Sequence, residues 1–251
     1  MTYKFITTLL LSLSLLMGMS KASAQETSVD QTQLEEMTRL LKIRIGSDDI
    51  ETPVETRLKG VYQTRFGGKF AYLVDGGRYV FIGEMFDLEA AENMTEVSRQ
   101  KMVVDELANF GDEKLIIFPA QDEQLAVLNV FTDTSCSYCQ KLHTEIKYLQ
   151  EAGISVRYFP YPRGSNRGPG YQAMQKVWCS DDKPGALSIA KRTKPGSLGD
   201  GNCAAASYVD DGFELGERLG VTGTPALFTA AGVKFNGYVP YQQLIPQLLG
   251  N

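Results

Sequence analysis

Residues 130–143 read VFTDTSCSYCQKLH, and they hold the clearest structural signal in the chain. The apolar run over 125–132 is typical of a buried strand, and the residues after it predict a helix over about 137–152. Cys136 and Cys139 therefore stand where a strand ends and a helix begins. Because the N-terminal end of a helix stabilises an anion, we expect the pKa of Cys136 to lie below that of a free cysteine. Its thiolate would then be ready to attack a disulfide.

The spacing along this helix separates the roles of the two cysteines. Cys139 shares an apolar face with Leu142, Ile146 and Leu149, which follow it at i+3, i+7 and i+10. We therefore expect Cys139 to face the core and Cys136 to lie at the exposed tip of the helix. In this interpretation Cys136 attacks a substrate disulfide, and Cys139 resolves the mixed disulfide that forms.

Two other interpretations of the C-x-x-C sequence compete with this one. It could be half of a zinc site, but such a site needs four ligands, and Cys179 and Cys203 do not form a second C-x-x-C. It could also be a structural disulfide, although two intervening residues close a very small loop with little entropic gain. We favour the redox site, with no metal and no cofactor.

The first residues predict export. Lys4 provides a short basic region, residues 5–19 form an apolar run, and residues 22–24 read ASA, a pattern that signal peptidase cleaves. Because the run is too short for an ordinary membrane-spanning helix, we expect residues 1–24 to be a cleaved signal peptide. An uncleaved signal anchor is the alternative. The net charge of −5, without a basic stripe, argues against nucleic acid as a partner.

Cys179 and Cys203 are the remaining pair among the four cysteines. An exported protein meets an oxidising compartment, so we predict a structural disulfide between them. A second exchanging pair is the functional alternative. His143, the one histidine, lies four residues after Cys139 and could tune the thiol pair. We favour a half-buried helix histidine with a satisfied ring nitrogen.

The region from 112 to 251 is predicted to be an α/β domain, because strands alternate with helices. A helical stretch over about 170–219, broken by Gly and Ser, forms an insert in this domain. The remaining expected strands span 115–118, 154–159, 226–229 and 233–236, and the last expected helix spans 241–249.

Residues 25–88 are predicted to form a small α+β domain. Asp30 is a suitable N-cap for a helix that carries Leu34, Met37 and Leu41 on one face. Strands are expected over 61–66, 70–74 and 79–82, and Asp75-Gly76 is typical of a hairpin turn. A module this small would be marginal alone, and pairing with a second copy would bury more of its surface.

Residues 89–111 are predicted to form a linker helix, which spans about 93–110 and ends near Gly111. Val103, Leu107 and Phe110 form a narrow apolar stripe on an otherwise polar helix. We favour a spacer between two domains. The alternative is that the helix packs on the C-terminal domain.

The residues quoted at 130–143 closely resemble the active-site strand and helix of the DsbC/DsbG periplasmic disulfide isomerases. Further matches are the segments 154–158, 177–179 and 223–226, which read ISVRY, VWC and GTPA. The N-terminal module and the linker helix resemble the family's dimerisation domain and linker more loosely. The resemblance covers essentially the whole chain after residue 24.

The resemblance implies a thioredoxin-like fold for the C-terminal domain and a periplasmic homodimer with both cysteine sites facing an uncharged cleft. It implies a cis bond between Thr224 and Pro225, whose backbone groups would bind a substrate strand, and we also assign Tyr138 to substrate binding. A membrane reductase of the DsbD type would keep Cys136 and Cys139 reduced, and misfolded exported proteins with disulfides would be the substrates.

One residue departs from the family pattern, because Ser137 stands where DsbC has Gly and DsbG has Pro. The balance of isomerase, reductase and oxidase activity is therefore open. Two alternatives remain beside a dimeric disulfide isomerase. One is a DsbG-like reductase of single oxidised cysteines, and the other is a holdase chaperone that needs no thiol.

Overall fold

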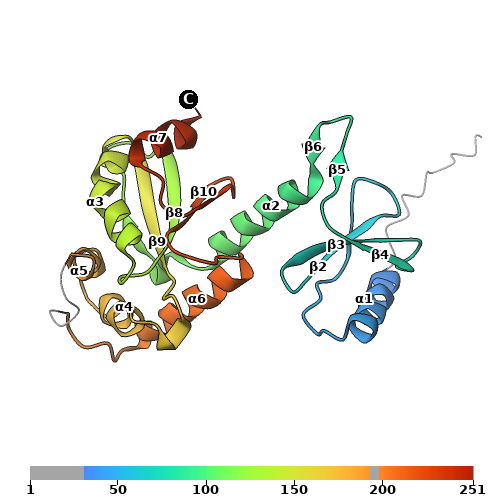
Figure 1. The fold of residues 1–251 in the computed structure, drawn as a ribbon, viewed down its shortest axis with the longest axis horizontal. Coiled ribbons are helices and arrows are strands. Elements are labelled where there is room, and N and C mark those ends of the chain that lie inside the picture. Colours follow the sequence, from blue (N-terminus) through green and yellow to red (C-terminus); the bar gives the residue numbers. More distant parts are fainter. Residues whose placement is uncertain (1–30, 193–197, 251) are drawn as a thin grey trace, which may run out of the picture.

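The structure is a computed structural model that describes residues 31–192 and 198–250. The predicted signal peptide, residues 1–24, and the expected N-cap Asp30 lie outside the described residues. Two bodies are joined by one long helix, α2 (Met94–Asn109) (Figure 1). Within the described ranges, no helix has the length and apolar character needed to cross a membrane.

The N-terminal body is one helix packed on a four-stranded antiparallel sheet of order β1-β2-β3-β4. Its core is small and centres on Met37, Leu41 and Leu73. The turn after β3 places Asp75 and Gly76 at positive φ, as a tight hairpin requires. The elements are α1 (Gln31–Ile45), β1 (Val54–Glu55), β2 (Tyr62–Phe66), β3 (Lys69–Val74) and β4 (Tyr79–Ile82).

A short hairpin of β5 (Phe86–Asp87) and β6 (Glu92–Asn93) leads into α2, and sequence analysis did not anticipate it. Asn93 caps the helix, because its side chain accepts a hydrogen bond from the backbone N–H of Glu96 at 3.0 Å.

The apolar stripe of α2 is buried against the C-terminal body. Val103, Leu107 and Phe110 belong to the same core cluster as Phe131 and Phe159 of the C-terminal sheet. The expected stripe is therefore present, but the second half of the helix is part of the C-terminal core. The alternative of packing on the C-terminal domain holds for this half, so α2 is not a free-standing spacer.

The C-terminal body is an α/β domain around a five-stranded sheet of order β11-β10-β8-β9-β7. Only β8 and β9 run parallel, and α3 connects them. The expected α/β class is confirmed. The elements outside the insert are a 3₁₀ turn (Asp112–Lys114), β7 (Ile116–Phe118), β8 (Ala126–Thr132), α3 (Ser137–Glu151), β9 (Ile154–Pro160), β10 (Ala226–Thr229), β11 (Lys234–Asn236) and α7 (Tyr241–Leu249).

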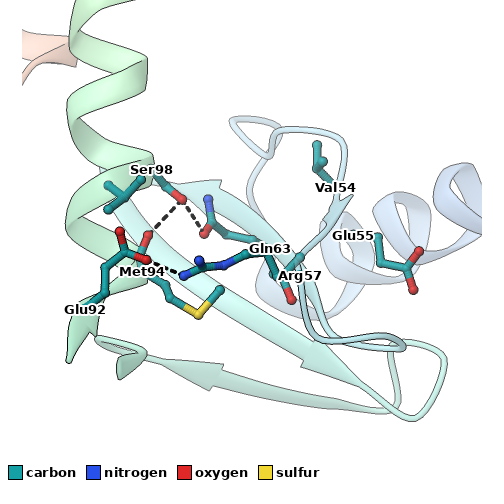
Figure 2. Close-up of a pocket in the computed structure, with 9 residues that line it drawn as sticks. Val54, Glu55, Arg57, Gln63, Glu92, Met94 and Ser98 are labelled. Atoms are coloured by element: carbon teal, nitrogen blue, oxygen red, sulfur yellow. Dashed lines mark hydrogen bonds and ion pairs between the residues drawn. The ribbon is translucent and has the colours of Figure 1, made fainter. Parts of the chain in front are cut away.

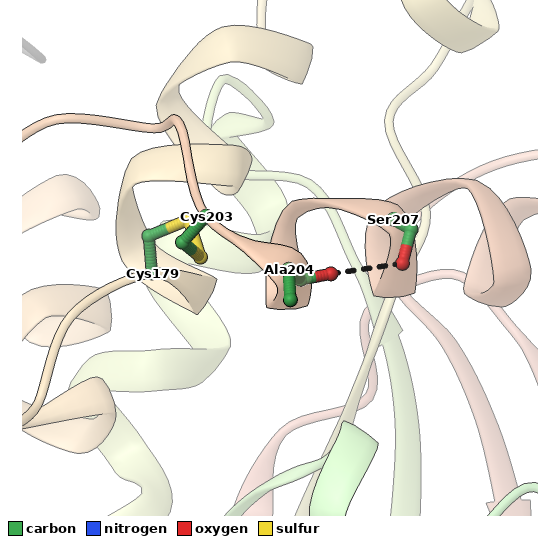
Figure 3. The surroundings of a disulfide bond; sticks show 4 residues. All are labelled: Cys179, Cys203, Ala204 and Ser207. Carbon is green, nitrogen blue, oxygen red and sulfur yellow. Dashed lines mark hydrogen bonds between the residues drawn. A yellow bond between two sulfur atoms is a disulfide. The ribbon is translucent and has the colours of Figure 1, made fainter.

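The helical insert lies between β9 and β10, where the sequence predicted one broken helical stretch. Cys179, at the end of α4, is bonded to Cys203 with an S–S distance of 2.07 Å (Figure 3). Trp178 anchors the insert, since its indole N–H donates to the carbonyl of Lys114 at 2.8 Å. The described part of the insert contains the 3₁₀ turns Ser165–Arg167 and Ala204–Ser207 and the helices α4 (Tyr171–Trp178), α5 (Lys183–Ala190) and α6 (Tyr208–Arg218).

Candidate active site

Cys136 is the N-cap residue of α3, directly after the loop that leaves β8. The expectation that it lies exposed at the helix tip was wrong, because only 3% of its surface is accessible. The loop before β10 covers it, and the Cys136 Sγ lies 3.2 Å from the carbonyl oxygen of Thr224. The two residues between the cysteines, Ser137 and Tyr138, are exposed instead, with Tyr138 at 60%.

The surroundings of Cys136 favour its thiolate. A hydrogen bond from the Cys139 side chain is the largest cause that lowers the pKa of Cys136, to about 5. Burial opposes this shift, whereas hydrogen bonds from the backbone N–H groups of Tyr138 and Cys139 add to it. These N–H groups belong to the first turn of α3, where helix geometry leaves donors free for an anion.

Cys139 has the opposite environment. Its side chain is fully buried on the apolar face of α3, together with Leu142, Ile146 and Leu149. Burial is the largest cause that raises the pKa of Cys139 well above its ordinary value. Both cysteines are free thiols in the structure. The arrangement can therefore hold one thiolate and one thiol side by side, as nucleophilic exchange with a second resolving step requires.

The peptide bond between Thr224 and Pro225 is cis, and the carbonyl of Thr224 faces Cys136. Tyr138 stacks on Tyr238, with ring centroids 6.2 Å apart. The Lys141 ammonium lies 4.5 Å from the centroid of the Tyr238 ring. Tyr138, exposed, and Tyr238, partly buried, thus form an aromatic pair beside the motif.

Asp133 is a part of the site that sequence analysis did not single out. Its side chain is fully buried and accepts hydrogen bonds from the backbone N–H and hydroxyl of Ser135 at 2.7 and 2.8 Å. The backbone N–H and the Nε of Arg163 donate to its other oxygen at 3.0 and 3.1 Å. The carboxylate therefore ties the loop before Cys136 to the loop after β9. The only sequence signal for this role was the position of Asp133 between the predicted strand and the C-x-x-C motif.

His143 is more buried than expected, with 3% of its surface accessible. Its Nδ1 lies 3.1 Å from the hydroxyl of Tyr158, and its Nε2 lies 3.0 Å from the hydroxyl of Ser188. Burial lowers the pKa of His143 to about 3, so the ring is neutral at neutral pH. A satisfied core histidine is the interpretation that these contacts favour.

Among residues 31–192 and 198–250, no group of three or more His, Cys, Asp or Glu side chains is arranged to hold a metal ion. A hollow of about 320 Å³ lies between residues 54–57 and the start of α2 (Figure 2). Arg57 and Glu92 form an ion pair at its border, and Ser98 donates to Gln63 at 2.9 Å. None of its lining residues belongs to the cysteine site.

Comparisons with known proteins agree with this geometry. Residues 111–249 match the thioredoxin-like domain family, and residues 20–96 match the N-terminal domain family of disulfide bond isomerase proteins. A linker-deletion mutant of ScsC from Proteus mirabilis is 20% identical, covers 62% of this chain and 85% of its own, and has a TM-score of 0.50. That likeness concerns the fold alone.

Curated relatives carry the family assignment. The thiol:disulfide interchange protein DsbC of Salmonella typhimurium is 35% identical over 202 residues, which is 79% of each chain. The DsbC of Escherichia coli K12 is 32% identical over 225 residues, which is 89% of this chain and 87% of that one. With its paired cysteines, its thioredoxin-like domain and its isomerase-type N-terminal domain, the chain belongs to the DsbC family of thiol:disulfide interchange proteins.

Proposed function

We propose that this protein is an exported, homodimeric disulfide isomerase and reductase in which Cys136 is the nucleophile and Cys139 the resolving thiol. The observation that carries the proposal is the unequal pair at the start of α3, where one pKa is lowered and the other raised. Export follows from the predicted signal peptide at residues 1–24, and the compartment would be the periplasm.

The exchange reaction needs no cofactor. The Cys136 thiolate attacks one sulfur of a substrate disulfide, which forms a mixed disulfide and releases a substrate thiolate. If that thiolate attacks another substrate disulfide, it forms a new bond and releases a different substrate thiolate. When this second thiolate attacks the substrate sulfur of the mixed disulfide, a rearranged substrate disulfide forms and Cys136 leaves as a thiolate. If Cys139 attacks first, the substrate leaves reduced and Cys136 is bonded to Cys139. A membrane reductase of the DsbD type would then have to restore the dithiol.

The backbone beside Pro225 is suited to holding the substrate close to Cys136. The Thr224 carbonyl already lies at hydrogen-bond distance from the sulfur, so the backbone of a substrate cysteine would lie near the same segment. Tyr138, exposed and stacked on Tyr238, would contact side chains that flank the substrate cysteine.

The N-terminal sheet would provide the dimer contact. β4 is the last strand in the order β1-β2-β3-β4, so one of its edges has no neighbour within the described sheet. The strand is also apolar and exposed, with Phe81 and Ile82 at 61% and 60%. An exposed apolar edge is a template for pairing with another chain, and here a second copy of the same strand fits it.

A misfolded substrate would be held by apolar side chains of the N-terminal body. Leu58, Phe86 and Leu88 are exposed at 60%, 58% and 91%, and they line a second hollow beside α2. Isomerisation needs a chain to remain bound while its disulfides are exchanged, which one isolated cysteine site cannot provide. Exposed apolar patches of this kind are typical of interaction surfaces.

Cysteine variants of the full chain test the proposal. Cys136→Ala should abolish both the reduction of insulin and the refolding of scrambled ribonuclease, while Cys139→Ala should accumulate mixed disulfides at Cys136. The redox state of Cys136 in the periplasm should be reduced at steady state. If Cys136→Ala prevented aggregation of an unfolded protein as the main and undiminished activity, the thiol-independent chaperone would replace our proposal.

Reduction of a sulfenylated single-cysteine protein, without refolding of scrambled ribonuclease, would instead favour the DsbG-like reductase. Sedimentation of the intact chain should give a dimer. A monomer would leave the N-terminal body without the role that we assign to it.

A further inference from the structure

Lys191 is a buried amine close to the thiol pair, and the reaction described above does not use it. It follows α5 in the helical insert, and only 4% of its surface is accessible. Its Nζ donates to the Thr132 hydroxyl at 2.7 Å and lies 5.4 Å from the centroid of the Tyr158 ring. Thr132 ends β8, so the amine lies beneath the loop that carries the two cysteines.

A buried ammonium is costly unless an anion or strong acceptors compensate for the lost water. The nearest carboxylate candidate, Asp133, is already paired with Arg163 at 3.1 Å and accepts hydrogen bonds from Ser135. Among the described residues, Lys191 has no carboxylate within 4.0 Å. Asp133 still acts on Lys191 electrostatically, but within residues 31–192 and 198–250 no carboxylate forms a direct ion pair with the Lys191 ammonium.

The other titratable groups around Lys191 do not carry a negative charge at neutral pH. His143 is neutral, because burial lowers its pKa to about 3. Burial raises the pKa of Tyr158, whose hydroxyl lies against the His143 ring. Cys136 and Cys139 are the two groups that become anionic during the reaction, and both interact electrostatically with Lys191.

We propose that Lys191 is a positioning residue for the resolving step, because its buried ammonium stabilises the thiolate that forms on Cys139. In this step Cys139 loses its proton and attacks the Cys136 sulfur of the mixed disulfide. The bond between Cys136 and the substrate breaks, the Cys136–Cys139 bond forms, and the released substrate thiolate takes up a proton. The inference rests on the proposed roles of the two cysteines.

The electrostatics of the site agree with this role. Burial is the largest cause that raises the pKa of Cys139, and the Lys191 charge is the largest that opposes it. Burial also lowers the pKa of Lys191 to about 8, with Cys139 as the strongest influence in the other direction. The amine therefore remains mostly protonated at pH 7, and its charge is present when Cys139 must ionise.

The test uses the full-length reduced protein and one equivalent of dithionitrobenzoate. Attack by Cys136 releases the first chromophore, and resolution by Cys139 releases the second. Lys191→Met keeps much of the side-chain volume and removes the charge. It should slow the second phase at pH 7 by about tenfold or more, since one pKa unit changes the thiolate fraction tenfold. It should also move the pH profile of this phase upward, with a smaller change in the first.

Three variants separate a charge effect from a structural one. Lys191→Arg should restore much of the second phase, because it keeps the charge. Thr132→Val removes the hydrogen bond but leaves the ammonium, so it should slow resolution less than Lys191→Met. Lys191→Gln is the substitute if Lys191→Met does not fold, as judged by circular dichroism and thermal unfolding.

Two results would overturn the inference. One is a second phase in Lys191→Met with the rate and pH profile of the parent protein. The other is that Thr132→Val and Lys191→Met slow the second phase equally and Lys191→Arg does not restore it. Lys191 would then have a structural role and not an electrostatic one. If instead Cys136 were not the nucleophile, Cys136→Ser would still release the first chromophore in a fast phase. That result would contradict the proposed function and not only the role of Lys191.

Discussion

The two bodies of this chain differ in how much core each one holds. The C-terminal body contains two buried clusters that include Trp178, Tyr158 and Phe131 without exposed surface. The buried cluster of the N-terminal body comprises Met37, Leu41, Ile50, Tyr62 and Leu73. The larger body has the apolar mass to fold around its own sheet, whereas the smaller one has little to spare for independent stability.

The exposed apolar surface is distributed in the opposite way. Most of the exposed large hydrophobic side chains belong to α1, the N-terminal sheet and the segments that flank it, and few belong to the catalytic body. The body with the weaker core therefore offers the stronger surface for association, while the body with the stronger core carries the chemistry. This division agrees with a disulfide-exchange site that the C-terminal body positions, and with a dimer contact that the N-terminal body provides.

The largest expected effect comes from matched deletions in the two cores. Leu142 and Leu73 are both fully buried, and replacing either by Ala should cost about 2–5 kcal/mol in the free energy of unfolding of its own body. Leu142→Ala should also disturb Cys139, which shares its helix face. Leu73→Ala should weaken the dimer and leave alkylation of Cys136 unchanged. Thermal unfolding, sedimentation and alkylation rates check this, and an altered alkylation rate in Leu73→Ala would contradict the separation.

The second prediction concerns the chemistry of the catalytic body alone. With its pKa lowered from 9.0 to about 5, Cys136 should be alkylated with a pH midpoint near 5. At pH 7 its thiolate fraction should exceed that of an ordinary thiol by about a hundredfold. Cys139→Ala should raise the midpoint, because the Cys139 side chain is the largest cause of the shift.

The same shift makes the stability of the reduced protein depend on pH. Between about pH 5 and 9 the unfolded state binds the proton that folded Cys136 has lost. This contribution is therefore complete above pH 9 and is lost as the pH falls through 5. The raised pKa of Cys139 acts in the opposite sense above pH 9. Denaturant unfolding of the reduced protein at several pH values measures the balance, and a Cys136 midpoint near 9 would refute the assignment.

The third prediction removes the N-terminal body. A fragment that begins at Met94 keeps α2, because Val103, Leu107 and Phe110 are part of the catalytic core. It should be monomeric and reduce small disulfides as fast as the intact chain does. It should isomerise scrambled ribonuclease roughly thirtyfold more slowly, because the dimer holds two binding surfaces at a high effective concentration around one substrate and the fragment does not. It should also be oxidised more readily by a membrane oxidase. If the fragment and the intact chain had equal isomerase activity, the N-terminal body would have no role in isomerisation.

The smallest expected effect comes from the edge strand. Phe81→Glu places a charge on exposed β4 and should weaken dimerisation by about tenfold, or about 1.4 kcal/mol. Leu125→Glu is the matched control, because Leu125 of the catalytic body is also 61% exposed, as Phe81 is. Sedimentation at several concentrations compares them. Equal weakening by both variants would show a general charge effect, and no weakening by Phe81→Glu would place the dimer contact elsewhere.

Several elements were predictable from sequence because they leave a local signal. The apolar periodicity identified α3 and the face that buries Cys139, and Asp75-Gly76 identified the hairpin between β3 and β4. The hairpin of β5 and β6 was not predicted, because strands of two residues are too short to show an alternation of apolar and polar residues.

The sequence by itself therefore determined the order of the elements, the thiol pair at the start of a helix and the family to which they belong. Only the tertiary structure decided that Cys136 is covered by Thr224, which lies 88 positions away, and that Lys191 reaches Thr132 across 59 positions. It also decided that the stripe of α2 packs into the catalytic core. Local patterns record which face of an element is apolar. The partner of that face, and the groups that meet around one thiol, depend on how distant segments pack together.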